Sequence, residues 1–372
     1  MFRHTVPLGR IFGIVIDLDY SWFLVFGLLT WVLAVNYYPA EFKNWRPGEY
    51  WLMGALTAIM LFVSVLLHEL GHSVVAKRYG IAVPRITLFI FGGVSQIATE
   101  PTSAAMEFWI AIAGPAVSFA LGTIFWELRP VLASVPPLLA LAKYMALINL
   151  GLGAFNLIPA FPLDGGRVFR AIIWAISGNF RRATSIAVFT GRFFGFLMIF
   201  LGVWQAMAGS FFNGMWTAFI GWYLESAATS QVQEQRVKDL LAGHKVSEMM
   251  TRDCAQIPDD LTLQELVENH ILAGGHRCFV VVHGDKAIGL VTLAEIKKVP
   301  RSSWPTTSVT QVVIPADKLV STPADAEVWT TIEKMERNGI NQLPVVERGR
   351  LIGVFSRDDL VHYMGTLQSL RA

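Results

Sequence analysis

The segment HELGH, residues 68–72, places two imidazoles and a carboxylate at a spacing that suits metal-dependent hydrolysis. In a helix, His68 and His72 lie one turn apart on the same face, where both can bind one zinc ion at about 2.0–2.1 Å. Glu69 lies beside them and can accept a proton from an attacking water. The spacing therefore predicts a metal centre with an adjacent general base.

A catalytic zinc commonly has three protein ligands and one open position, so a third ligand must come from elsewhere in the chain. The candidate is Asp164, in the segment NLIPAFPLDGG at residues 156–166. Its prolines prevent a regular helix and its glycines permit a tight turn, so a loop could re-enter the protein and direct the carboxylate at the histidines. An ordinary Asp-Gly turn at a helix end is the alternative. Two histidines and an aspartate fit zinc best among the common metals.

The composition around these residues is that of a membrane protein. Of 372 residues, 53% are hydrophobic and 16% are charged, and the mean hydropathy is +0.48, which is too apolar for an ordinary soluble protein. A helix needs roughly 20 mainly apolar residues to cross a bilayer. Six segments predict such helices: 20–36, 51–76, 104–128, 138–157, 184–208 and 211–229.

The HELGH motif lies within the second predicted span, toward one of its ends. A chance match in an unrelated helix is the alternative to a metal site. Three ionisable groups inside a membrane are costly unless they bind something, so the location favours a functional site.

The basic residues of the short loops predict how the chain is oriented. Residues on the side with more positive charge face the cytoplasm, which places both termini there and the protein in the cell membrane. The net charge of +2 gives no reason to expect a nucleic-acid partner. The richer side carries Arg3, Arg10, Lys77, Arg78, Arg85, Arg167, Arg170, Arg181 and Arg182, against Lys43, Arg46 and Arg129 on the other.

Two segments beside the spans have the composition of strands. Residues 10–19 and 84–97 are rich in β-branched and aromatic side chains, and Gly92 and Gly93 interrupt the second. This pattern predicts strands or a hairpin at the membrane surface.

An internal repeat follows a polar, charged connector at residues 232–245. One copy begins at Val246 and the other at Val309, and their aligned glycines, Gly289 and Gly353, lie 64 residues apart. Each copy is expected to form helix, strand, turn, strand and helix, and the two copies should pack as a pair. The predicted domains are 1–231 in the membrane, 246–305 for copy one and 306–372 for copy two.

The paired motifs HELGH and NLIPAFPLDGG closely resemble those of the site-2 protease family, and the segments FGGV (91–94) and AGPAVS (113–118) are also similar. The resemblance implies cleavage of a substrate's transmembrane helix, with zinc held by His68, His72 and Asp164. It implies Glu69 as base and acid, and Asn156 near the scissile carbonyl. It also implies a membrane-edge β-sheet that pairs with an unwound substrate strand. The partners expected are a transmembrane protein substrate and the lipid bilayer.

The repeat resembles a tandem pair of CBS (cystathionine β-synthase) domains, α/β modules that often bind adenine nucleotides such as ATP, ADP or AMP and can form a homodimer. The family's ribose and phosphate contacts correspond here to Thr292 and Glu295 in copy one and to Ser356 and Asp359 in copy two. Copy one has Glu295 where the family usually has Asp, so copy two is the better match. The alternative is that Thr292 and Ser356 are helix N-caps whose acidic partners complete capping boxes without a ligand.

Two other functions compete with the peptidase. CBS pairs also occur on channels and transporters, so a nucleotide-gated metal or ion transporter is one alternative; Glu69 separates the two, because transport needs ligands but no base. A non-catalytic membrane adaptor is the other, and it would require a broken motif.

Overall fold

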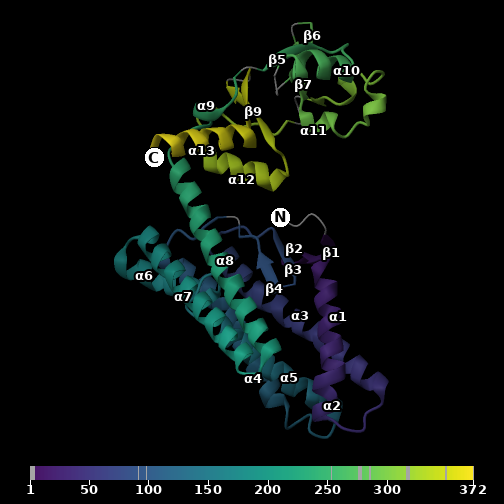
Figure 1. The fold of residues 1–372 in the computed structure, drawn as a ribbon, viewed down its shortest axis with the longest axis vertical. Coiled ribbons are helices and arrows are strands. Elements are labelled where there is room, and N and C mark those ends of the chain that lie inside the picture. The colour runs from purple at the N-terminus through teal and green to yellow at the C-terminus, as the bar shows by residue number, and fades with distance from the viewer. Residues whose placement is uncertain are drawn as a thin grey trace. The chain divides into compact units, whose positions relative to one another are not determined.

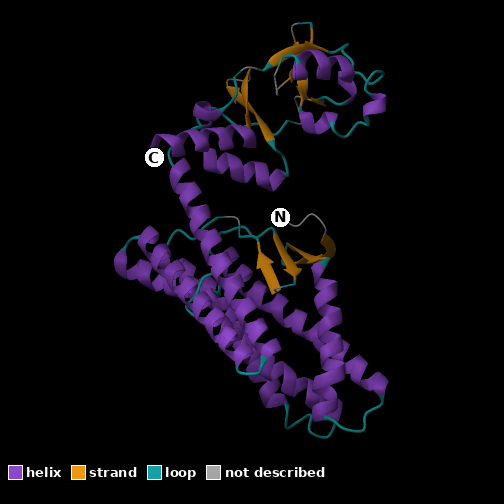
Figure 2. Ribbon diagram, viewed as in Figure 1, coloured by secondary structure: helices purple, strands orange, loops and turns teal. Residues whose placement is uncertain are grey.

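The computed structural model describes residues 5–90, 92–97, 99–252, 254–274, 279–284, 286–315, 319–347 and 350–371. The chain forms two compact units, Met1–Gln233 and Glu234–Ala372, and the boundary falls within helix α8 (Phe211–Leu241). A helical membrane unit followed by an α/β unit confirms the predicted fold class. Figure 1 labels the elements, and Figure 2 separates helices from strands.

Helices build most of the first unit. Gly178, with φ of +65°, ends the short helix that follows Asp164, because glycine takes the left-handed conformation without steric cost. A π-helical turn, η1 (Leu33–Tyr37), joins the first two helices. The helices before α8 are α1 (Ser21–Val32), α2 (Tyr38–Glu41), α3 (Pro47–Arg78), α4 (Ala104–Leu128), α5 (Pro136–Asn156), α6 (Asp164–Ser177) and α7 (Phe180–Met207).

Five helical segments within the described part of the chain are long and apolar enough to cross a membrane, and they correspond to the first five predicted spans. The sixth expected span, 211–229, lies in α8 and is not among them. Polar residues such as Asn213 and Glu225 lower the hydropathy of α8, which then continues as a polar helix. The five are Ser21–Glu41, Pro47–Arg78, Ala104–Leu128, Pro136–Asn156 and Phe180–Met207.

The segments expected to form strands make one four-stranded sheet, in the order β1-β2-β3-β4. Two antiparallel pairs, β1 with β2 and β3 with β4, meet in its centre, where β2 and β3 run parallel. The sheet is thus confirmed, although Phe91 of the FGGV segment lies outside the described residues. Its strands are β1 (Thr5–Ile11), β2 (Ile14–Asp19), β3 (Arg85–Phe89) and β4 (Gly92–Ser95).

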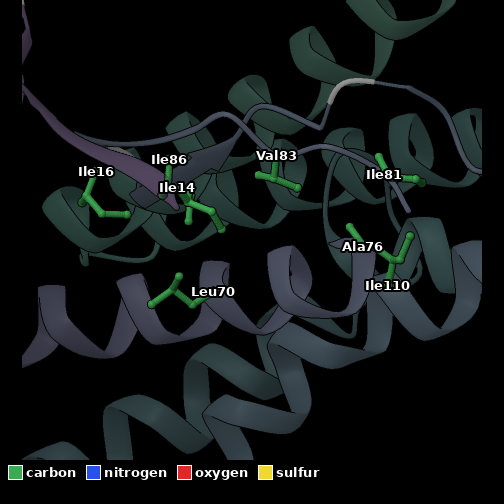
Figure 3. Close-up of a cluster of buried hydrophobic side chains, with 8 residues drawn as sticks. All are labelled: Ile14, Ile16, Leu70, Ala76, Ile81, Val83, Ile86 and Ile110. Atoms are coloured by element: carbon green, nitrogen blue, oxygen red, sulfur yellow. The ribbon is translucent and has the colours of Figure 1, made fainter. Parts of the chain in front are cut away.

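This sheet packs against α3, the helix that carries HELGH, through a hydrophobic core. Ile14 and Ile86 of the sheet are fully buried, and they pack in one cluster with Leu70 and Ala76 of α3 and Ile110 of α4. Figure 3 shows Leu70 on α3, facing the sheet residues. Leu70 lies within the HELGH motif, so its packing against the sheet fixes which way this turn of α3 faces.

The second unit holds the two repeats, and their cores cross the sequence boundary between them. Val246 and Met249, from the start of copy one, pack with Leu343 and Phe355 of copy two. Val309, from the start of copy two, packs into the core of copy one. The copies therefore form one body, as the repeat predicts.

Two sheets form the strand layers of this unit, one ordered β5-β6-β7-β8 and the other β10-β9. The strands are β5 (Ala255–Pro258), β6 (Phe279–His283), β7 (Lys286–Val291), β8 (Ile314–Pro315), β9 (Gln342–Glu347) and β10 (Arg350–Ser356). The helices are α9 (Val246–Met249), α10 (Leu263–Glu265), η2 (Leu266–Leu272), α11 (Leu293–Ile296), η3 (Arg301–Ser303), η4 (Val309–Gln311), α12 (Val328–Asn338) and α13 (Arg357–Arg371).

Candidate metal centre

Three donor atoms from distant parts of the sequence meet in the first unit. His68 Nε2 and His72 Nε2, both on α3, lie 3.0 Å and 3.1 Å from Oδ2 of Asp164, the first residue of α6. The two Nε2 atoms are 3.3 Å apart. Donors that hold one zinc tetrahedrally at about 2.0–2.1 Å are roughly 3.3 Å from one another. The spacing of the three atoms therefore fits one such ion.

The outer nitrogens of the imidazoles fix how the rings face the centre. His72 Nδ1 lies 2.7 Å from the backbone carbonyl oxygen of Ile110 on α4. A carbonyl only accepts, so His72 Nδ1 carries a proton, and Nε2 is the nitrogen left to bind a metal ion. His68 Nδ1 lies 2.9 Å from Ser118 Oγ, also on α4. Hydrogen bonds of this kind are typical of metal-bound histidines, whose second nitrogen is held by the protein.

Helix α4 passes close to the imidazole rings of α3, and a glycine on α4 leaves the space that the rings occupy. Gly114 lies where a Cβ atom would come within 2.1 Å of His72 Nε2 and 2.7 Å of His68 Nε2. Any side chain there would occupy the space between the donors. Gly114 is a site residue that chemical reasoning from the sequence missed, although it lies in the AGPAVS segment.

The loop before Asp164 folds tightly against the helix that follows it. A Cβ on Gly165 would lie 2.3 Å from the Leu157 backbone, and one on Gly166 would lie 2.6 Å from Phe161 N. The glycines are thus needed for the turn that brings Asp164 to the histidines. Burial raises the pKa of Asp164, but the imidazoles of His72 and His68 outweigh it, and the net direction is well below the usual range. A carboxylate held at this place is suited to bind a cation.

Glu69 lies half-buried beside the donors and is held by the edge strand β4. Ser95 Oγ donates to Glu69 Oε2 at 2.6 Å, and Ser73 Oγ lies 3.3 Å from Ser95 Oγ. A Cβ on Gly93 would lie 2.5 Å from Glu69 Cγ. The sheet therefore contacts the predicted base directly, through a hydroxyl and through a position where only glycine fits.

Asn156, the other predicted catalytic residue, lies at the end of α5, and its hydrogen bond stays within that helix. Its Nδ2 donates to the carbonyl oxygen of Leu152 at 3.0 Å. The structure brings His68, His72 and Asp164 together, whereas the Asn156 amide is turned back on its own helix.

An ion pair near the centre was also missed. Arg170 of α6 is 6% exposed and Glu107 of α4 is fully buried, and Arg170 Nε donates to Glu107 Oε1 at 2.7 Å. Arg170, which was counted among the basic residues between the spans, is buried by packing inside the protein. A carboxylate within the third predicted span was the available signal, since buried charges in spans pair with one another.

The turns predicted to bind nucleotide differ between the two copies. In copy two, Asp359 Oδ2 accepts from Ser356 N at 2.8 Å and from Ser356 Oγ at 2.6 Å, and Asp359 N donates back to Ser356 Oγ. Thr251 Oγ1 donates to Asp359 Oδ1 at 2.7 Å. This is the capping box of the alternative interpretation. In copy one, Thr292 is buried and Glu295 pairs with Lys298.

A cavity of about 620 Å³ lies in the same unit. Its lining includes Lys245, Arg252, Asp325 and Glu347, and it includes none of the four residues expected to contact nucleotide. The cavity and the predicted contact residues are thus different parts of the unit.

Comparisons with known proteins agree on the two parts of the chain. The model described as peptidase family M50 matches residues 56–135 and 130–199, and the CBS domain model matches residues 246–302 and 309–366. Rip3 of Mycobacterium tuberculosis strain H37Rv, which bears a zinc metalloprotease name, is 35% identical over 96% of this chain and 92% of its own length. Zinc metalloprotease MJ0392 of Methanocaldococcus jannaschii is 29% identical over 98% of each chain.

Among solved structures, the site-2 protease from Methanocaldococcus jannaschii is 31% identical, with a TM-score of 0.43. The match covers 61% of this chain and 94% of that chain.

Proposed function

Because this chain belongs to peptidase family M50, we propose that it cleaves peptide bonds within the transmembrane segments of other membrane proteins. A membrane metallopeptidase of the site-2 type follows from the family itself and from full-length relatives with zinc metalloprotease names. The observation that carries the proposal is the convergence of His68 Nε2, His72 Nε2 and Asp164 Oδ2 beside Glu69, which Ser95 holds.

His68, His72 and Asp164 are the proposed zinc ligands. When bound, zinc polarises the scissile carbonyl and makes a water more acidic. His68 Nε2 and His72 Nε2 lie 3.3 Å apart and both face Asp164 Oδ2, so one cation placed between them would contact all three ligand atoms.

Glu69 is the proposed proton carrier, and Asn156 the proposed oxyanion donor. Glu69 accepts a proton from the attacking water and delivers it to the leaving amine. The Asn156 amide would have to leave Leu152 O to donate to the oxyanion that develops on the carbonyl.

Strand β4 is the proposed docking edge for the substrate. In the described sheet it pairs with β3 on one side only, and its Ser95 hydroxyl contacts Glu69. An unwound substrate segment that pairs with this edge would present its peptide bonds beside the base. Pairing also exposes a bond that a helix would hide.

Cleavage by purified full-length protein in detergent or vesicles tests the function. A peptide with a transmembrane segment should be cut within that segment by wild type, with the site read by mass spectrometry. Chelation should stop the reaction and added zinc should restore it, whereas Glu69→Gln should be inactive under every condition. Cutting that survives chelation, or that Glu69→Gln performs at the wild-type rate, would refute the mechanism.

The ion-transport alternative has less support. The relatives that span the chain carry metalloprotease names, and transport gives no role to Glu69 and its Ser95 contact.

The CBS pair is proposed to regulate cleavage by binding an adenine nucleotide, mainly through Ser356 and Asp359, and to support a homodimer. The family match supports the fold of these modules. A nucleotide would have to replace the hydrogen bonds within the capping box, and it controls activity only if it binds one arrangement of the pair better than another. Calorimetry of the full chain with ATP, ADP and AMP tests this, and no binding of any of them would exclude it.

The orientation with both termini in the cytoplasm is also a proposal, and it requires α8 to cross the membrane as a sixth span besides the five apolar helices. The basic residues of the loops support it. A reporter fused after Lys245 should be found in the cytoplasm. A reporter found outside the cell would contradict the proposed orientation.

A further inference from the structure

Helix α4 contributes no donor to the cluster, yet its contacts reach both histidines. Ile110, Gly114 and Ser118 lie on one face of α4, because positions three and four apart in a helix share a face. The Ile110 carbonyl holds His72, the Ser118 hydroxyl holds His68, and Gly114 leaves room for both rings.

Glu107 continues the same face one turn before Ile110 and contacts the helix that carries Asp164. Its Oε1 accepts from Arg170 Nε at 2.7 Å and also from Nη2. Both side chains are almost wholly buried, with 7% of Arg170 and none of Glu107 exposed. The pair thus joins α4 to α6 inside the protein.

Aromatic rings lie over the guanidinium and restrict it further. Its Cζ is 4.9 Å from the centre of the Phe161 ring and 4.8 Å from that of Phe180. Phe161 belongs to the loop that leads into Asp164, and Phe180 begins α7. A planar guanidinium suits this combination of a carboxylate and two rings, whereas an ammonium does not.

A buried ion pair does not by itself explain stability, since apolar residues of similar volume often serve as well or better. Its position does suggest a role. Asp164 and Arg170 lie on the same short helix, about 9 Å apart along its axis. Fixing Arg170 against α4 therefore fixes the end of α6 that presents the Asp164 carboxylate.

We propose that α4 is the common support of all three zinc donors, and that Glu107 and Arg170 are positioning residues that hold Asp164. The inference rests on the proposed zinc site. It gives the metal centre one rigid reference: α4 orients the histidines through Ile110 and Ser118, and it orients the aspartate through the ion pair.

The test replaces the pair with apolar residues, Glu107→Leu with Arg170→Met, so that no unpaired charge stays buried. The matched control is Arg192→Met with Glu225→Leu, which removes an Arg–Glu pair between α7 and α8 whose nitrogen and oxygen are 3.3 Å apart. The measurements on full-length protein are zinc affinity, the visible spectrum of the Co²⁺-loaded form, thermal unfolding, and kcat and KM.

The first double variant should unfold near the wild-type temperature but bind zinc about 10–100-fold more weakly, as when other supporting groups of metal ligands are lost. Its Co²⁺ spectrum should shift and kcat should fall with little change in KM, while the control resembles wild type. Wild-type zinc affinity and spectrum in the folded variant would overturn the inference alone. Wild type that binds no zinc would overturn the proposed function as well.

Arg170→Lys decides the question if the double variant fails to fold. It keeps the charge but loses the planar contacts, so a folded Arg170→Lys protein should also bind zinc more weakly. Unchanged zinc affinity in that variant would contradict the positioning role.

Discussion

The donor cluster on α3 and α6 and the turn at Ser356 in the second unit both gather polar side chains, but they arrange them differently. At the turn, each oxygen of Asp359 accepts a hydrogen bond, from Ser356 or from Thr251. In the cluster, His68 Nε2, His72 Nε2 and Asp164 Oδ2 all lie within 3.3 Å of one another and point at one spot.

The difference separates a site suited to a metal ion from one that is complete without a ligand. Three ligand atoms that point at one spot can share a single cation, and catalytic zinc commonly has three protein ligands. A capping box pairs its groups with one another and offers no such spot. The comparison predicts that substitutions in the cluster weaken zinc binding, whereas substitutions at the turn chiefly lower the stability of the second unit.

The largest effect should follow Asp164→Ala. Only two protein donors would remain, so zinc affinity should fall by more than the 10–100-fold typical of a lost supporting hydrogen bond, and cleavage should stop. Zinc content after dialysis and the cleavage rate measure both effects. Full zinc content in this variant would remove Asp164 from the site.

A single methyl group at Gly114 should have a similar but smaller effect. The new Cβ of Gly114→Ala would lie 2.1 Å from His72 Nε2, so the rings must move and zinc binding should weaken sharply. Gly151→Ala on α5 is the matched control, because nothing lies within 4 Å of its added Cβ. Equal zinc affinity in the two variants would show that Gly114 is not part of the cluster.

Ser118→Ala should weaken zinc binding about 10–100-fold, since His68 would lose the group that holds its Nδ1. Ser185→Ala removes a hydroxyl that only contacts a carbonyl in its own helix and should leave zinc affinity unchanged. Isothermal competition with a chelator compares the two. A Ser118 variant that matches the Ser185 variant would argue that His68 needs no such support.

The smallest effect should come from the turn. Asp359→Ala removes the capping box and should cost about 1 kcal/mol of the second unit's stability, with zinc content unaffected. Glu295→Ala removes an ion pair whose lysine is largely exposed and should change stability by less. Chemical unfolding followed by tryptophan fluorescence tests this order, and a loss of zinc in Asp359→Ala would break the comparison between the regions.

The sequence predicted those features that depend on a local pattern of residue types, such as a ligand motif or an apolar run. HELGH and the Pro- and Gly-rich segment before Asp164 predicted the three donors, and alternating or continuous apolar runs predicted the sheet and the first five spans. Sequence reasoning had no means of finding contacts between distant helices. Gly114 matters through a distance to His72, and Arg170 resembled a loop charge because its partner, Glu107, lies 63 residues away.

Zinc content and cleavage measured together on wild type and Glu69→Gln test the central claim most directly. Glu69 lies beside the donors, but none of the three converging atoms belongs to it. Both proteins should therefore hold one zinc per chain, and only wild type should cut a transmembrane substrate. Zinc lost from Glu69→Gln, or wild-type cleavage by it, would contradict the account.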